Sequence, residues 1–302
     1  MKLRWLLITI IIITCSIGYT ISEVTKQQNS PEKSVNFNSQ SNNLSNPIEM
    51  LTLARFDRHP KLQVLLPLYS YPNWYDKDKY LWKQVIIAAK KVKITAIINP
   101  NNGPDRAPPN PDYQQGIKDL HQAGVKIIGY VPTNYTNRDL QAVKADIDLY
   151  HKYFKIDGIF IDEVTTTQQK IYYYSQLYQY IKSLSPLYLT IVNPGTNVDE
   201  NYITQPVADI TVNFENTQKV WANYDPPIYT KKYSHQHFAA LIHTTPNRKL
   251  MKSILDRSIK GRVGYIYITD DSLETANHNP WDSLPAYWQA EINYIQKINA
   301  NN

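Results

Sequence analysis

The stretch GIFIDEV, residues 158–164, is an apolar run that ends on two adjacent acids, Asp162 and Glu163. Its length and continuous hydrophobicity are typical of a β-strand that is buried on both faces. A carboxylate is costly to remove from water. The two acids therefore mark either a solvated strand end or a position where carboxylates perform chemistry.

Similar apolar runs recur along the chain at intervals of about 22–32 residues, with helix-period segments between most of them. Such regular alternation predicts parallel strands covered by helices, and eight units predict an α/β fold, the closed (β/α)8 or TIM barrel. An open doubly wound sheet is the alternative. It usually has a glycine-rich phosphate turn after its first strand, and LYSYPNWYD (68–76) contains no glycine. The eight runs are VLLPLYSY (64–71), ITAIINP (94–100), KIIGYVPT (126–133), GIFIDEV (158–164), LYLTIVNP (187–194), DITVNFEN (209–216), FAALIHTT (238–245) and VGYIYIT (263–269).

The N-terminal region differs from the predicted barrel. Lys2 and Arg4 precede an apolar segment, residues 5–21, so we expect residues 1–22 to be a signal peptide or a membrane anchor. The protein would then be exported, either secreted or tethered to the outer face of the cytoplasmic membrane. Residues 23–60 begin with a segment rich in Asn, Ser and Gln, which predicts a disordered polar linker. The predicted barrel spans residues 61–298.

Composition argues against several kinds of partner. The chain has 302 residues and a net charge of +6, but its basic residues are scattered, so we expect no nucleic-acid partner. Cys15 is the single cysteine, which excludes a disulfide framework. His235 and His237 have no evident third ligand, so we predict no metal and no cofactor. The 24 Tyr and six Trp suit either a sugar-binding groove or half-buried helix faces. We expect a monomer.

Polar residues end the eight predicted strands. In a barrel the active site lies at the carboxyl ends of the strands, so these residues are candidates for function. They are Tyr69, Asn99, Thr133, Asp162 with Glu163, Asn193, Glu215, His243 and Asp270.

Strand alternation predicts where these side chains point. On residues 158–164, Asp162 points into the barrel beside Phe160, whereas Glu163 points away unless the strand has already ended. On residues 209–216, the prediction directs Ile210, Val212 and Phe214 toward the helices, and Thr211, Asn213 and Glu215 inward.

Asp162 and Glu215 lie at the same level on strands that are two apart. Their backbones should be roughly 10 Å from each other, at ~4.8 Å per strand. Inward side chains bring the carboxylates to about 5–9 Å, which suits an acid pair that cleaves a glycosidic bond. One carboxyl would protonate the leaving oxygen while the other attacks the anomeric carbon or activates water. Two solvated or Arg-paired acids are the alternative.

Several motifs resemble spherulation-specific family 4, the spherulin-4-like proteins. The resemblance runs from about residue 64 to about residue 221 and weakens after about residue 225. Its blocks are PLYSYPNW (67–74), IINPNNGPDRAPPNPDY (97–113), GYVPTNYTNRD (129–139), DIDLYHKYFKIDGIFIDEV (146–164) and VNPGT (192–196).

The resemblance implies a (β/α)8 barrel and the activity of the family's characterised fungal members. Those glycoside hydrolases cut α-1,4-linked galactosamine or N-acetylgalactosamine exopolysaccharide internally. The family's paired acids fall on Asp162 and Glu163, and its further acid falls most plausibly on Glu215. Asp105 is a departure, because the family often has a second glycine there.

The remaining candidates have two interpretations each. Asn99 and Asn193 each precede a proline, and either bind sugar hydroxyls or cap the following turn. Tyr69, Tyr130 and Tyr135 either stack on sugar rings or pack the barrel rim. His243 and Asp270 are supported as substrate-binding residues by position alone. Arg138 is expected to pair with an acid of the following helix.

The leading hypothesis is therefore an exported endo-acting glycosidase for an amino-sugar polysaccharide. Asp162 is the nucleophile or base, Glu215 the general acid, and Glu163 the residue that tunes or orients the pair; the roles of Asp162 and Glu215 could be exchanged. A non-catalytic, surface-tethered polysaccharide-binding or coat protein is the alternative. A polysaccharide deacetylase is disfavoured, because the sequence shows no convincing Asp-His-His metal constellation.

Overall fold

A computed structural model describes residues 61–76, 80–274 and 279–301. The predicted signal peptide or anchor and the predicted linker lie outside these ranges. Among the helices of the described residues, none has the length and apolar character required to span a bilayer.

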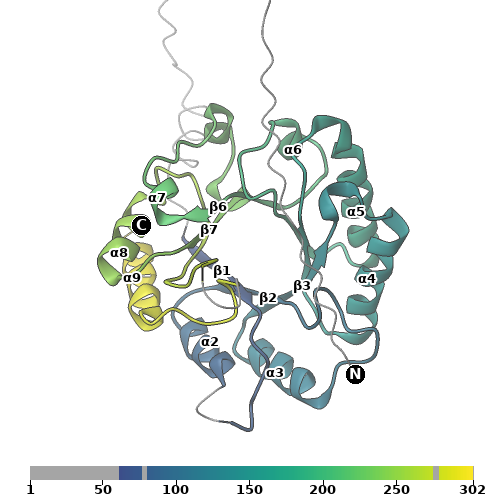
Figure 1. The fold of residues 1–302 in the computed structure, drawn as a ribbon, viewed down its shortest axis with the longest axis horizontal. Helices are drawn as coiled ribbons and strands as arrows, with labels where there is room; N and C mark the ends of the chain where they lie inside the picture. Colours follow the sequence, from purple (N-terminus) through teal and green to yellow (C-terminus); the bar gives the residue numbers. More distant parts are fainter. Residues whose placement is uncertain (1–60, 77–79, 275–278, 302) are drawn as a thin grey trace, which may run out of the picture. The chain divides into compact units, whose positions relative to one another are not determined.

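The described residues form a closed barrel of eight parallel strands in sequential order, surrounded by helices (Figure 1). The predicted (β/α)8 barrel is thus confirmed. The strands are β1 (Gln63–Leu68), β2 (Ile94–Ile98), β3 (Lys126–Pro132), β4 (Gly158–Asp162), β5 (Leu189–Val192), β6 (Ile210–Thr217), β7 (Phe238–His243) and β8 (Tyr265–Ile268). The helices are α2 (Leu81–Ala89), α3 (Pro111–Gln122), α4 (Leu140–Tyr153), α5 (Ile171–Leu184), α6 (Asn201–Thr204), α7 (Gln218–Trp221), α8 (Arg248–Arg257) and α9 (Trp288–Asn301). Short 3₁₀ helices are η1 (Asn134–Thr136), η2 (Gln168–Lys170), η3 (Ile228–Lys232) and η4 (His235–His237).

Three of the helices around the barrel begin at recognisable capping residues. The Asn110 side chain accepts a hydrogen bond from the Tyr113 N–H, and Pro111 occupies the first turn of α3. Asp139 caps α4 and Asn247 caps α8 in the same way. Such caps satisfy backbone donors that the helix itself leaves unpaired. The capped helices therefore begin at fixed places just beyond the carboxyl ends of the strands.

Two glycines allow neighbouring elements to approach closely. A Cβ on Gly158 would lie 2.0 Å from the Leu189 carbonyl oxygen of β5. A Cβ on Gly129 in β3 would lie 2.6 Å from the Tyr150 ring of α4. The glycine that opens GIFIDEV is therefore required by strand packing, whereas the acids that end it are not explained by packing.

A β-bulge corrects the predicted alternation on β6. Phe160, Ile191 and Ile210 are in register across β4, β5 and β6, and Phe160 lines a cavity inside the barrel. In-register residues of parallel strands point to the same side. Ile210 and Val212 therefore point inward and Thr211 points toward the helices, so the prediction was wrong for these three residues.

The register of β6 shifts between Val212 and Phe214, with Asn213 as the extra residue. A bulge of this kind resets which residues face the barrel. Phe214 then packs on Trp221 of α7, with ring centroids 5.0 Å apart. Glu215 pairs with Leu241 and, like it, lines the interior cavity. The predicted inward direction of Glu215 is thus met, but through a bulge that strict alternation did not include.

Loops at the carboxyl ends of the strands contain unusual backbone. All but one of the described non-glycine residues with positive φ lie there, the exception being Arg262. Such conformations are costly for ordinary residues and gather at functional sites. The residues are Asn102 after β2, Asn134, Tyr135 and Thr136 after β3, Glu163 after β4, and Thr244 after β7.

Candidate active site

A cavity of about 250 Å³ lies inside the carboxyl end of the barrel. Most of the predicted site residues line it, which places side chains from six strands, or from the positions directly after them, around one space. The predicted residues among its lining are Tyr69, Asn99, Tyr130, Asp162, Asn193 and Glu215.

Asn193 joins the two carboxylates at the centre of this cavity. Its Nδ2 atom donates to Asp162 Oδ1 at 2.8 Å and to Glu215 Oε2 at 2.5 Å. Because both bonds share one nitrogen, the two oxygens can be no farther apart than the sum of these distances, 5.3 Å. The Asn193 Oδ1 atom accepts from the Gly195 N–H at 3.0 Å, which fixes the orientation of the amide.

Further neutral donors complete the surroundings of the pair. The Tyr130 hydroxyl donates to Asp162, and the Trp281 side chain donates to Glu215. Within the part of the chain that the structure describes, neither acid forms an ion pair with Lys, Arg or His. The two negative charges are thus held together by neutral groups only. The predicted alternative of Arg-paired acids does not hold for them.

Burial and mutual repulsion make both acids harder to ionise. Burial raises the pKa of Asp162, and hydrogen bonds from Tyr130 and Asn193 oppose that rise. Burial, followed by the charge of Asp162, raises the pKa of Glu215 to about 7. A carboxyl group with this pKa can donate a proton near neutral pH. The pair therefore contains one acid suited to proton donation beside one better stabilised as a carboxylate.

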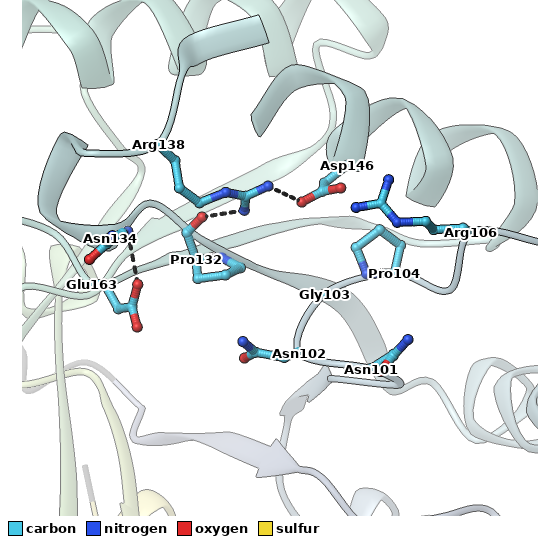
Figure 2. Close-up of a pocket in the computed structure, with 10 residues that line it drawn as sticks. All are labelled: Asn101, Asn102, Gly103, Pro104, Arg106, Pro132, Asn134, Arg138, Asp146 and Glu163. Carbon is cyan, nitrogen blue, oxygen red and sulfur yellow. Dashed lines mark hydrogen bonds and ion pairs between the residues drawn. The ribbon is translucent and has the colours of Figure 1, made fainter. Parts of the chain in front are cut away.

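Glu163 lies beside this cavity and lines a second one. β4 ends at Asp162, and Glu163 has a φ of 55°, so the strand alternation stops before it. Its Oε2 atom accepts from the Asn134 N–H at 2.8 Å (Figure 2). The second cavity, of about 410 Å³, is lined by Glu163, Asn134 and Asn102 among others. Asn102 lines both cavities, so they are neighbours at the barrel mouth.

Arg138 has the structural role that was expected. Its guanidinium donates to Asp146 Oδ2 of α4 at 2.6 Å and to the Pro132 carbonyl oxygen at 2.7 Å (Figure 2). The ion pair forms one wall of the second cavity. It ties the end of β3 to α4, and so supports the η1 turn that presents Asn134 to Glu163.

Three predicted residues lie outside the lining of both cavities. Tyr135 is 58% exposed, and its N–H donates to the Glu163 carbonyl oxygen at 2.8 Å. His243 is buried edge-to-face against Trp281, with centroids 6.0 Å apart, and burial lowers its pKa. Asp270 Oδ2 accepts from the Ala286 N–H at 3.1 Å. The structure thus places His243 behind a cavity wall and Asp270 in a loop contact, and their substrate-binding roles stay predictions.

Sequence reasoning missed Trp281 and Asn102. Trp281 lies in the segment between β8 and α9 and contributes both a wall and a hydrogen bond to Glu215. That segment has no strand pattern, and the family resemblance was already weak there. Asn102 belongs to the quoted NPNNGP block, but its position four residues beyond the end of β2 gave no reason to select it.

The H-x-H segment has ordinary partners. His237 Nδ1 lies 3.1 Å from the Asp209 carbonyl oxygen, and His235 is buried. Across residues 61–76, 80–274 and 279–301, there is no group of three or more His, Cys, Asp or Glu side chains arranged to hold a metal ion.

The molecule is a TIM-barrel protein that presents a carboxylate pair at its mouth. The family model of spherulation-specific family 4 matches residues 63–295, so the chain belongs to this family. Spherulin-4 of Physarum polycephalum is 33% identical over an alignment of 246 residues, and the match covers 79% of this chain and 71% of that protein. Sph3 of Aspergillus clavatus, crystallised in complex with GalNAc, superposes with a TM-score of 0.65 at 25% identity. That match covers 78% of this chain and 98% of the Sph3 chain.

Proposed function

We propose that this protein is an endo-acting glycoside hydrolase for an α-1,4-linked galactosamine or N-acetylgalactosamine polysaccharide. The observation that carries the proposal is the Asp162–Asn193–Glu215 bridge, which brings oxygens of two carboxylates to 5.3 Å or less in a cavity at the barrel mouth. Among the residues that the structure describes, neither carboxylate has a cation partner. Two such carboxyl groups are what hydrolysis of a glycosidic bond requires.

Glu215 is assigned as the general acid. Its pKa of about 7 leaves a large fraction protonated at neutral pH, and its proton goes to the glycosidic oxygen as the bond to the anomeric carbon breaks. The departing chain thus leaves as an alcohol. Asp162 then stays as the charged partner, because the Tyr130 hydroxyl and the Asn193 amide both stabilise its carboxylate.

Asp162 is assigned as the nucleophile. An oxygen separation of at most 5.3 Å fits the ~5–5.5 Å of retaining enzymes, and is shorter than the ~6.5–9.5 Å that leaves room for a water molecule in inverting ones. Asp162 would attack the anomeric carbon and form a glycosyl ester. Water then attacks the same carbon while Glu215 takes up its proton, which regenerates both groups and retains the anomeric configuration.

The choice of polymer has two supports. Sph3, which is similar over most of both chains, was crystallised with GalNAc, and the sequence motifs imply the same class of sugar. The two cavities are also lined by four acids, Asp146, Asp162, Glu163 and Glu215, against two arginines, Arg106 and Arg138, so the mouth is acidic on balance. A deacetylated galactosamine polymer is cationic, so this acidic mouth attracts it. Glu163 is assigned to orient the substrate or the pair from the second cavity.

The deciding experiment is cleavage of defined polymers. Purified full-length protein is incubated with α-1,4-galactosaminoglycan, fully acetylated and partly deacetylated, and the products are analysed by mass spectrometry. We expect internal cleavage into oligosaccharides. Binding without any new reducing ends, over long incubation, would instead support the polysaccharide-binding or coat protein.

Export completes the proposal. The apolar segment of residues 5–21 after Lys2 and Arg4 supports placement of the barrel outside the cytoplasm, where a structural polysaccharide would be met. Fractionation of cells that express the full chain, followed by protease treatment of intact cells, tests this. A chain that stays protease-resistant inside the cell contradicts export.

A further inference from the structure

The loop after β1 exposes three aromatic side chains. Tyr71 is 40% exposed, Trp74 46% and Tyr75 61%. The Trp74 and Tyr75 rings meet edge-to-face, with centroids 5.9 Å apart. Scattered exposed apolar residues are normal, but a group of large rings within one loop indicates a contact surface. Tyr71, Trp74 and Tyr75 are called the aromatic platform below.

One carboxylate holds two of the rings in place. Asp112 Oδ2 accepts from the Tyr71 hydroxyl at 2.7 Å, and Asp112 Oδ1 accepts from Trp74 Nε1 at 2.8 Å. Asn110, the N-cap of α3, donates to the Tyr71 hydroxyl at 2.9 Å. Asp112 lies in the first turn of α3, where the helix dipole stabilises a negative charge. These bonds fix the two rings while leaving them partly open to solvent.

Buried rings support the platform from below. Tyr71 meets Tyr113 edge-to-face at 5.6 Å, and Tyr113 meets Trp82 at 5.8 Å. Trp82 is fully buried and donates to the Ser70 carbonyl oxygen at 3.1 Å. The platform is therefore anchored to the core. A rigid aromatic surface loses little conformational entropy when it binds a ligand.

The platform lies close to the proposed active site along the chain. Tyr69 lines the cavity of the carboxylate pair, and Trp74 follows it by five residues. An extended chain covers at most about 18 Å in that number of residues. The platform also contacts Asn110, which ends the loop that supplies Asn102 to both cavities, and Asp112 in the first turn of α3. The platform therefore belongs to the loop after β1 and contacts the end of the loop after β2, and these same two loops supply Tyr69 and Asn102 to the cavity of the carboxylate pair.

We propose that the aromatic platform is a distal subsite that stacks on pyranose rings of the polysaccharide, beyond the residues held at the cleavage point. A sugar ring has an apolar face and a polar edge, which suits exposed Trp and Tyr rings bordered by the Asn110 and Asp112 side chains. The subsite deepens the proposed function and depends on it for the identity of the polymer. Only chains long enough to reach both the cavity and the platform would gain this contact, so affinity should increase with chain length.

The test measures binding separately from cleavage. Full-length protein with Glu215→Gln, which is expected not to cleave, is titrated with galactosaminoglycan chains of graded length. Adding Trp74→Ala should weaken the affinity for long chains about three- to tenfold and should change the affinity for short chains much less. Asp112→Ala keeps the Trp74 indole but removes the hydrogen bond that holds it, and should lower the affinity for long chains by a smaller factor. Tyr294→Ala is the matched control, because Tyr294 also donates to a carboxylate, Asp256, but on the outer helices.

Several results would overturn the subsite. Equal affinity with and without Trp74, an equal loss on short and long chains, or no dependence of binding on length in the parent protein each contradict it. So would a Trp74→Ala variant that changes only the oligomeric state in size-exclusion chromatography, since the platform would then be a contact between copies. Wild-type protein that binds long chains through Trp74 but never cleaves them refutes the hydrolase and leaves the subsite standing.

Discussion

Strands β4 and β6 each have an acid at both ends, and the acids at the amino-terminal ends have different partners from those at the carboxyl ends. Asp157 and Asp209 immediately precede these strands, whereas Asp162 and Glu215 lie at or near their carboxyl ends. The same pair of strands thus presents two acids at each end of the barrel. The surroundings of the four side chains show which acids stabilise the fold and which are free for chemistry.

At the amino-terminal end each acid has a cationic or basic partner and a backbone donor. Asp157 Oδ2 accepts from the Ile127 N–H at 2.7 Å and contacts His121 Nε2 at 2.9 Å. Asp209 accepts from Lys182 Nζ at 2.6 Å and from the Thr190 N–H at 2.8 Å. These bonds connect each acid to the neighbouring strand or helix, so their role is structural.

At the carboxyl end the acids face each other instead. Asp162 and Glu215 share the Asn193 amide, and both have raised pKa values because of burial. Holding two carboxylates together in a buried cavity costs stability, and such a cost persists where function requires it. This difference between the two ends is the main argument for the proposed active site at the carboxyl end.

The largest expected effect comes from removing either acid of the pair. Asp162→Asn and Glu215→Gln should each lower kcat by about 10³-fold or more, because each removes a nucleophile or a proton donor. Reducing-end release from the polysaccharide measures this, with circular dichroism as a check on folding. Asp157→Asn is the matched control at the other end of β4 and should keep full kcat. Undiminished activity in both variants of the pair would refute the mechanism.

The pH dependence of activity should have two limbs. Glu215 must be protonated to act as the acid, so kcat falls about tenfold per pH unit above its pKa of about 7. Asp162 must be ionised, so kcat also falls on the acidic side, below a pKa that burial raises above the ordinary value. A rate that is constant from pH 6 to pH 9 would contradict the assignment of Glu215.

Asn193 should have an intermediate effect. Asn193→Ala removes the donor that both carboxylates share, which raises the pKa values of Asp162 and Glu215 further and frees their side chains. We expect kcat to fall by about ten- to a hundredfold, with the acidic limb of the pH profile moved upward. A fall in kcat with no change of the profile would indicate a merely structural role. Asn99→Ala, at the end of β2, provides a comparison on the same rim.

The barrel itself was predictable because of how parallel strands are buried. Strands that are covered by helices outside and packed inside read as continuous apolar runs, and eight such runs at regular spacing leave few other folds. The positions of Asp162 and Glu215 followed from the same pattern, since each terminates one of these runs. Their separation was predicted at about 5–9 Å, and the shared amide limits the two bridged oxygens to 5.3 Å or less.

Other features depend on contacts that a sequence pattern does not contain. The bulge at Asn213 arises from the pairing of β6 with β7, so alternation counted along β6 alone assigned Ile210 and Val212 to the wrong side. Trp281 reaches Glu215 from an irregular segment with no periodicity. The left-handed backbone of Glu163 directs its side chain to a second cavity. Each is a tertiary effect that overrides a local rule.

The smallest effect sharpens the contrast between the two ends of β6. Asp209→Asn removes the ion pair with Lys182 and should lower the free energy of unfolding by about 1–2 kcal/mol.

Glu215→Gln should instead raise the free energy of unfolding, relative to wild type, at pH 8. A carboxyl whose pKa is raised by folding stabilises the native state at low pH, and this stabilisation is lost as the pH rises through about 7. Urea denaturation at pH 5 and pH 8 separates the two variants. The wild-type protein loses stability between these pH values as Glu215 ionises, whereas the Glu215→Gln variant does not, so the variant is the more stable of the two at pH 8. A loss of stability for both variants at pH 8 would show that the two acids serve the same structural purpose, and the distinction between the ends of the barrel would fail.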